Sequence, residues 1–182
     1  MSVEVECKVL ISKEEFEKII KKFNLSISKI LKKDTYYRSE NMDSNARIRI
    51  REEEQFKNKK YRLTVKNKNV EDGFENNQEY ESVITNIDIL QKLFEVAKLE
   101  KCFEKTKLCY GFTYESGFFV EVEKVWIDEN NPIYAIEIER VTDKELQSFT
   151  KETEIDILKN FLDKKEIEVC DKDWTTLLRK DS

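Results

Sequence analysis

The sequence predicts an α+β protein in which eight antiparallel strands close into a β-barrel, with helices packed on the outside. Eight short segments have strand character, whereas only a few have helical spacing. Turn signals such as Glu115-Ser116-Gly117 and Asn130-Asn131-Pro132 separate neighbouring strands, which is typical of antiparallel hairpins. Most of the strands have a charged face and an apolar face. A closed barrel whose apolar outer face is covered by amphipathic helices accommodates both faces.

The strands follow from the alternation of apolar and charged residues along the chain. In the first strand, Val3, Val5, Cys7 and Val9 alternate with Glu4, Glu6 and Lys8. The eight expected strands are residues 3–9, 34–40, 45–52, 60–67, 78–84, 103–113, 118–128 and 133–141. Alternate side chains share a face, so such a strand turns one face to a core and the other to a charged environment.

Helices are expected between and after these strands. A capping box at Ser12 and Glu15 begins the first helix, and a second helix is expected around residues 87–99. Another capping box, at Thr142 and Glu145, begins C-terminal helices at about 143–179 that we expect to pack on or against the barrel. No repeat or low-complexity linker interrupts the chain, so residues 1–182 are expected to form a single domain.

The composition excludes several functional classes. Histidine is absent, which removes imidazole bases, Ser/His and Cys/His nucleophile pairs and histidine-ligated metals. There is no apolar run of about 18 residues and no secretory leader, so we expect no membrane partner and a cytoplasmic location. The net charge of −5 does not suit a nucleic-acid binder, so no nucleic-acid partner is expected. The oligomeric state stays open between monomer and homodimer.

The placement of charge within the strands is the main functional signal. Charged residues make up 39 % of the chain, and most charged strand faces carry a single sign. Side chains two residues apart lie about 7 Å from each other, where like charges repel by about 2.4 kcal/mol at an effective dielectric of 20. Repeating this over six strands favours a charged lumen that binds ions of opposite sign. Basic groups would hold phosphate oxygens, and carboxylates would hold Mg²⁺ or Mn²⁺.

Several motifs occur in a fixed order along the chain. They are Glu4-x-Glu6-x-Lys8, Asp34-Thr35-Tyr36-Tyr37, Ala46-Arg47-Ile48-Arg49, Leu63-Thr64-Val65-Lys66, Glu79-Tyr80-Glu81, Lys105-x-Lys107, Glu123-Lys124-Val125, Glu137-Ile138-Glu139 and Asp173-Trp174-Thr175-Thr176-Leu177-Leu178. This order resembles the CYTH superfamily, also called triphosphate tunnel metalloenzymes, whose N-terminal signature is ExExK. The superfamily includes inorganic, thiamine and RNA triphosphatases and class IV adenylate cyclases, and its fold is an eight-stranded antiparallel tunnel.

The resemblance implies roles for individual residues. The implied metal ligands are Glu4, Glu6, Glu123, Glu137 and Glu139, with Glu79 or Glu81 as further ligands or members of the charge network. The implied phosphate-binding residues are Lys8, Arg47, Arg49, Lys66, Lys105 and Lys107. Glu4, Glu6 and Lys8 form the implied catalytic set. The roles of Glu121, Arg51 and Arg62 stay open.

The resemblance also implies an activity. The first expectation is Mg²⁺- or Mn²⁺-dependent hydrolysis of a triphosphate, inorganic triphosphate before an organic or nucleoside triphosphate. The second is a class IV adenylate cyclase that converts ATP to cyclic AMP and pyrophosphate. The third is a non-catalytic module that binds polyphosphate.

Overall fold

The computed structural model describes residues 3–114, 117–142 and 146–179. Its strands are β1 (Val3–Ile11), β2 (Lys29–Arg38), β3 (Ala46–Gln55), β4 (Asn58–Asn67), β5 (Val70–Glu71), β6 (Phe74–Ile84), β7 (Glu100–Thr113), β8 (Phe119–Trp126) and β9 (Ile133–Thr142). Its helices are α1 (Lys13–Lys22), a 3₁₀ turn at Leu25–Ser28, α2 (Ile87–Val96), α3 (Gln147–Leu162) and α4 (Trp174–Leu178).

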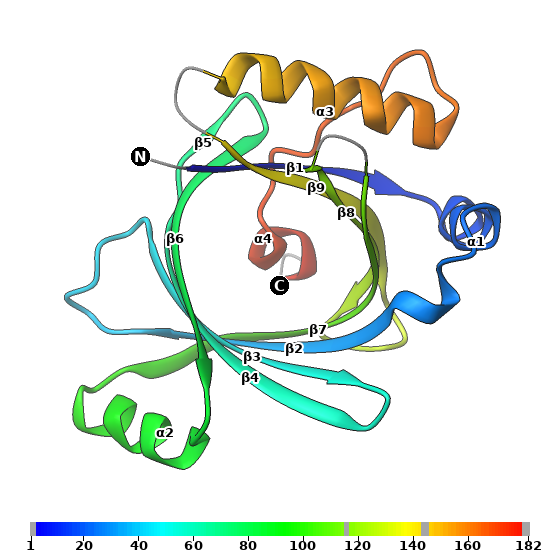
Figure 1. Cartoon of the computed structure of the whole chain (residues 1–182). Coiled ribbons are helices and arrows are strands. Elements are labelled where there is room, and N and C mark those ends of the chain that lie inside the picture. The colour runs from blue at the N-terminus through cyan, green and yellow to red at the C-terminus, as the bar shows by residue number, and fades with distance from the viewer. Residues whose placement is uncertain (1–2, 115–116, 143–145, 180–182) are drawn as a thin grey trace.

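Eight of these strands form a closed antiparallel barrel, as the sequence predicts. The order around the barrel is β1-β9-β8-β7-β2-β3-β4-β6, and β6 pairs with β1 to close it (Figure 1). The short strand β5 adds to β6. The helices lie outside the ring of strands, with the exception of α4, which lies within the ring in the view along the barrel (Figure 1).

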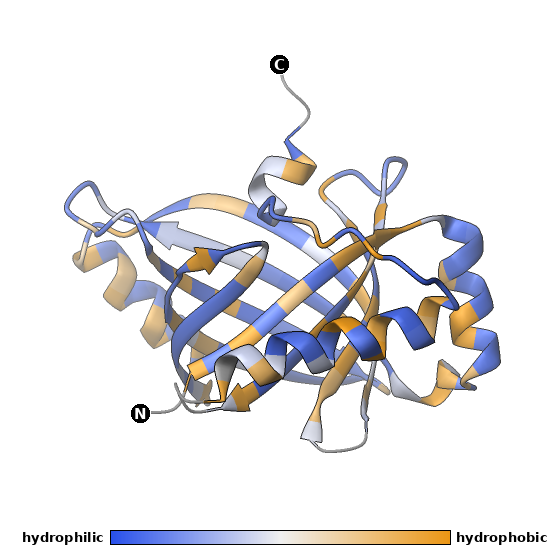
Figure 2. Ribbon diagram, turned by 90° about the horizontal axis from the view of Figure 1, so that it is seen from above, coloured by the Kyte–Doolittle hydropathy of each residue, from blue (hydrophilic) through white to orange (hydrophobic). Residues whose placement is uncertain are grey.

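The alternation in β1 shows how the sequence sorts its side chains between the two faces of the barrel wall. Val5 and Cys7 are fully buried in a core outside the barrel, whereas Glu4 and Glu6 line the lumen. The same alternation is visible as bands of both hydropathy colours along the other strands (Figure 2). The charged faces of the strands therefore meet inside the barrel.

Helices α1 and α3 cover the outer face of β1, β8 and β9. The shared core comprises Phe16 and Ile19 of α1, Leu158 and Phe161 of α3, and Val120, Val122, Ile136 and Ile138 of the barrel. Ser12 and Glu15 form the predicted capping box of α1, with Ser12 Oγ accepting from Glu15 N at 3.1 Å. None of the described helices has the length and apolar character that crossing a membrane requires.

Several element boundaries differ from those expected. Strand β2 begins at Lys29, ahead of the expected residue 34. Strand β6, which corresponds to the fifth expected strand, begins at Phe74, ahead of the expected residue 78. Thr142 is the last residue of β9 and does not cap α3, which follows Leu146 without a side-chain cap. Glu145, the other half of that expected capping box, lies outside the described residues.

Candidate active site

The lumen of the barrel has an acidic wall and a basic wall, each formed by four neighbouring strands. The acidic wall is β6, β1, β9 and β8, with Glu75, Glu79, Glu81, Glu4, Glu6, Glu139, Glu137, Glu121 and Glu123. The basic wall is β7, β2, β3 and β4, with Lys105, Lys107, Lys32, Arg47, Arg49, Arg51, Arg62 and Lys66. Lys8 on the acidic wall and Asp34 on the basic wall have the opposite sign.

Like charges face each other across neighbouring strands of both walls. On the acidic wall, Glu6 pairs with Glu139 of β9, and on the basic wall Arg51 pairs with Arg62 of β4. Like charges directly opposite each other destabilise a sheet. Side chains of the chain itself offset part of this repulsion, because Asp34 pairs with Arg51 and Lys66 pairs with Glu6.

A cavity of about 590 Å³ lies between the two walls. This volume is in the range of small-molecule sites in proteins. Charged residues of both walls line it, and Tyr36, Phe103 and Trp174 add aromatic surface. A ligand in the cavity can therefore contact cationic groups on one side and carboxylates on the other.

Glu4, Glu6 and Glu139 form what we call the first carboxylate group, in which one oxygen of each residue lies within 4.8 Å of the others. Lys66 Nζ lies 3.1 Å from Glu6 Oε2 and 3.5 Å from Glu4 Oε2. Burial raises the pKa of Glu4 to about 9, although Lys66 lowers it. Burial and the Glu6 carboxylate raise the pKa of Glu139 to about 7. The single ammonium group of Lys66 thus does not offset the cost of ionising Glu4 and Glu139.

The first carboxylate group fits a hard divalent cation. Mg²⁺ and Mn²⁺ prefer carboxylate oxygens as ligands. Glu4 Oε2 is buried and accepts no hydrogen bond from any part of the chain that the structure describes. Glu4, Glu6 and Glu139 would therefore hold such an ion, and its charge would offset the repulsion among them.

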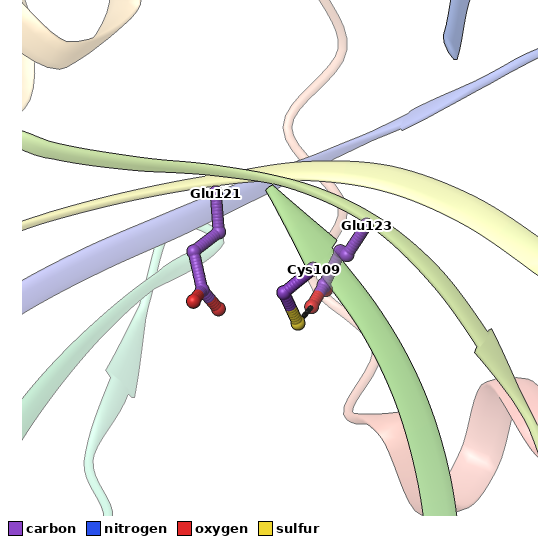
Figure 3. A group of neighbouring side chains, drawn as sticks. All are labelled: Cys109, Glu121 and Glu123. Atoms are coloured by element: carbon purple, nitrogen blue, oxygen red, sulfur yellow. Dashed lines mark hydrogen bonds between the residues drawn. The ribbon is translucent and has the colours of Figure 1, made fainter. Parts of the chain in front are cut away.

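Glu121, Glu123 and Glu137 form the second carboxylate group, which surrounds Lys107. Lys107 Nζ lies 2.5 Å from Glu123 Oε2, 3.0 Å from Glu137 Oε2 and 3.8 Å from Glu121 Oε2. Lys32 forms a close ion pair with the other oxygen of Glu121. Figure 3 shows Glu121 beside Glu123 and Cys109, whose Sγ lies 3.8 Å from Glu123 Oε2. The ammonium group of Lys107 therefore occupies the space between these carboxylates where a cation would otherwise lie.

The guanidinium groups of the basic wall differ in their partners. Arg51 makes a bidentate ion pair with Asp34, through Nε at 2.6 Å and Nη2 at 2.9 Å. Burial alone would raise the pKa of Asp34, but Arg51 and Arg49 hold it well below its usual range. Arg49 donates to Thr64 at 3.0 Å and to Glu79 at 3.3 Å. Arg47 donates to backbone carbonyls and forms no ion pair with a carboxylate of the described residues, so its charge can attract an anion in the cavity.

Helix α4 anchors Trp174 in the lumen. The Trp174 indole donates to Glu137 Oε1 at 2.7 Å, and its ring lies 5.0 Å from Lys105 Nζ and 5.4 Å from Lys8 Nζ. Burial and the neighbouring Lys107 lower the pKa of Lys105 to about 7. Burial also opposes charge on Lys8, but Glu137 and Glu75 raise its pKa above the ordinary value. Lys105 and Lys8 are thus both buried amines, but the pKa of Lys105 is lowered and the pKa of Lys8 is raised.

Most of the candidate residues from the sequence line the cavity, whereas Lys8 and Glu123 are buried beside it and do not line it. Arg51 and Glu121, whose roles were open, also line the cavity. Arg62 and Glu81 pair with each other at 2.6 Å and are about one-third exposed, so they lie at the margin of the lumen. Sequence reasoning did not single out five further charged residues that line the cavity: Lys32, Arg38, Lys68, Glu75 and Arg179. Lys32 and Glu75 precede the expected starts of their strands, so only a longer alternation could have identified them.

Comparisons with known proteins agree with this architecture. The model of the CYTH domain matches residues 2–180. The chain is similar to the PH1819 protein from Pyrococcus horikoshii OT3, with 23 % identity, a TM-score of 0.78 and coverage of 96 % of this chain and 97 % of that chain. It is similar to a conserved hypothetical protein, Pfu-838710-001, from Pyrococcus furiosus, with 24 % identity, a TM-score of 0.73 and coverage of 96 % and 99 %.

A third similar structure comes from Hippeastrum. HpAC1 from Hippeastrum is 16 % identical, with a TM-score of 0.70 and coverage of 98 % of this chain and 95 % of that chain. No match was found among curated proteins. These structural likenesses establish the fold, and the domain match extends over nearly the whole chain. On the strength of that match and of the two-walled barrel, the chain belongs to the CYTH domain family.

Proposed function

We propose that the protein hydrolyses a triphosphate in its lumen with the help of a divalent metal ion, and that inorganic triphosphate is the substrate. The observation that carries the proposal is the division of one closed lumen into an acidic wall and a basic wall. In a metal–triphosphate complex, the positive metal ion matches the acidic wall and the negative phosphate oxygens match the basic wall. Phosphoryl transfer depends mainly on positioning and on neutralising phosphate oxygens, and both walls serve these ends without histidine.

The basic wall is proposed to bind and orient the triphosphate. Arg47, Arg49 and Lys105 line the cavity and would donate to phosphate oxygens, and guanidinium groups bind such oxygens in pairs. Arg51 is fixed by Asp34 and adds positive charge behind them. Lys66 lies where the two walls meet, so it can contact a phosphate held beside the first carboxylate group.

The acidic wall is proposed to hold the metal ion through Glu4, Glu6 and Glu139. When bound, Mg²⁺ or Mn²⁺ would neutralise phosphate oxygens and lower the pKa of a water molecule. Lys8 lies beside Glu137 on the same wall and is buried under Trp174. Its ammonium group would contact the terminal phosphate or help to place the attacking water. Glu123 and Glu137 surround Lys107, and their role is treated below.

A class IV adenylate cyclase is the second candidate. HpAC1, a Hippeastrum structure of the same fold, has an adenylyl cyclase name and a dominant triphosphatase activity. The aromatic residues Tyr36 and Phe103, whose ring centroids lie 5.7 Å apart, also line the cavity and could contact a base. The charged walls are common to both candidates, so the reaction products have to distinguish them.

The test is a product assay on the purified chain with Mg²⁺ or Mn²⁺. Inorganic triphosphate and ATP are offered separately, and phosphate, pyrophosphate and cyclic AMP are quantified. Phosphate release from inorganic triphosphate without cyclic AMP from ATP is the expected result. Cyclic AMP with an equal amount of pyrophosphate would establish the cyclase instead. Tight triphosphate binding without any product would contradict both activities and favour a binding module.

A further inference from the structure

The two carboxylate groups of the lumen differ in how their charge is balanced. Around the first group, Lys66, Lys68 and Arg49 form ion pairs with Glu4, Glu6, Glu75 and Glu79, whereas Glu139, beside Glu4 and Glu6, forms none with the described residues. With all five carboxylates ionised, as a bound cation requires, the three cationic groups leave two negative charges, and one divalent cation supplies the matching positive charge. This region is therefore incomplete without a cation.

The second carboxylate group has its cations already. Lys107 and Lys32 form ion pairs with it, and the buried ammonium groups of Lys8 and Lys105 also attract Glu137. The group is also more deeply buried, because the side chain of Glu123 is 0 % and that of Lys107 is 3 % exposed. In the first group, Lys66 is 16 % and Glu4 is 18 % exposed. An ion from solution thus reaches the first group more easily.

The hydrogen bonds of the second group leave little room for a metal ligand. Glu137 Oε1 accepts from Trp174 and its Oε2 accepts from Lys107. Glu121 Oε1 accepts from Lys32. Among the six carboxylate oxygens, Glu123 Oε1 is the one that is buried and accepts no hydrogen bond from the described residues. Cys109, Glu121 and Glu123 have the spacing of a ligand set (Figure 3). However, Lys107 Nζ lies 2.5 Å from Glu123 Oε2.

We propose that the ammonium group of Lys107 is a permanent internal cation that takes the place of a second divalent ion, so that the lumen binds one metal ion. This inference rests on the proposed function, because it places that ion at Glu4, Glu6 and Glu139. Under this proposal, Glu123 and Glu137 hold the ammonium group of Lys107 in place. Lys107 in turn keeps these carboxylates of the acidic wall in position. Lys107 then acts on the substrate as a fixed positive charge that lines the cavity.

The first test counts metal ions on the native chain. The chain, without triphosphate, is titrated with Mn²⁺, and electron paramagnetic resonance follows the signal of the free ion. One bound Mn²⁺ per chain is expected, and Glu139→Gln should weaken its binding at least tenfold. Two bound ions would overturn the role of Lys107 while leaving the proposed function intact. No bound ion would overturn the inference together with the metal site of the proposed function.

The second test removes the internal cation. Lys107→Met keeps an unbranched side chain of similar volume, so the three carboxylates lose their ammonium group with little change in packing. We expect this variant to bind two Mn²⁺ ions, and Lys107→Met combined with Glu123→Gln to bind one. A single ion on Lys107→Met would overturn the inference. If Lys107→Met does not fold, the ion count on the native chain decides.

Discussion

Replacing Glu4 by glutamine should separate the stability of the barrel from its metal binding. The pKa of Glu4 is raised to about 9 from 4.5 by burial among other carboxylates, so its carboxyl is protonated at pH 7 in the metal-free folded chain. Glutamine is close in shape to a protonated glutamate. The variant therefore keeps the fold of the metal-free chain but cannot supply an anionic oxygen to a cation.

The magnitude follows from proton linkage. In the unfolded chain Glu4 ionises at its ordinary pKa of 4.5, so from pH 4.5 to pH 9 the folded chain binds the extra proton. The free energy of unfolding falls across that interval by about 1.4 kcal/mol per pH unit. At pH 7 this amounts to at most about 3.5 kcal/mol, which Glu4→Gln recovers. Solvent reaching the partly exposed side chain reduces the gain.

The assay is urea unfolding of native and variant chains in EDTA between pH 5 and 8, followed by thermal unfolding with added Mn²⁺. The metal-free variant should be more stable than the native chain, by a margin that grows with pH, and Mn²⁺ should stabilise it less. Glu95→Gln is the control, because Glu95 is 66 % exposed on α2 and pairs there only with Lys92 in the described structure. A variant that is less stable without metal, or that turns over triphosphate normally, would refute the reasoning.

Three further predictions concern the basic wall and α4. Asp34→Asn leaves Arg51 as a buried, unpaired cation, so urea unfolding should show a loss of about 3–5 kcal/mol; a loss below 1 kcal/mol would contradict it. Lys105, with a pKa of about 7, is charged below that pH, so the affinity for triphosphate should fall about tenfold from pH 6 to pH 8 in calorimetry. Lys105→Arg should abolish that fall, and an unchanged pH dependence would exclude Lys105 as its source. Trp174→Phe removes the donor to Glu137 and should cost about 1–3 kcal/mol in urea unfolding, whereas an unchanged stability would show that this hydrogen bond contributes nothing.

The sequence predicted the barrel and the sorting of its side chains because both depend on a period of two. Once β1 is identified as a strand, Glu4 and Glu6 have to share a face, and the apolar residues between them have to face the helices. Closure then places all charged faces in one lumen. The alternation is a local property of each strand, and the closure of the barrel is the one feature of the topology that has to be added to it.

Contacts between strands could not be predicted in the same way. That Lys107 lies among Glu121, Glu123 and Glu137 depends on the register of β7, β8 and β9, which the alternation does not determine. The sequence accordingly grouped Lys107 with the phosphate-binding residues and Glu123 with the metal ligands, without showing that the two are in contact.

The most direct test of the account is the position of Mn²⁺ in crystals grown with Mn²⁺ and tripolyphosphate. Anomalous scattering locates the ion independently of any assumption about the site. We predict one strong peak among Glu4, Glu6 and Glu139, with phosphate density against Arg47, Arg49 and Lys105. A peak among Glu121, Glu123 and Glu137, or phosphate density outside the lumen, would contradict the account.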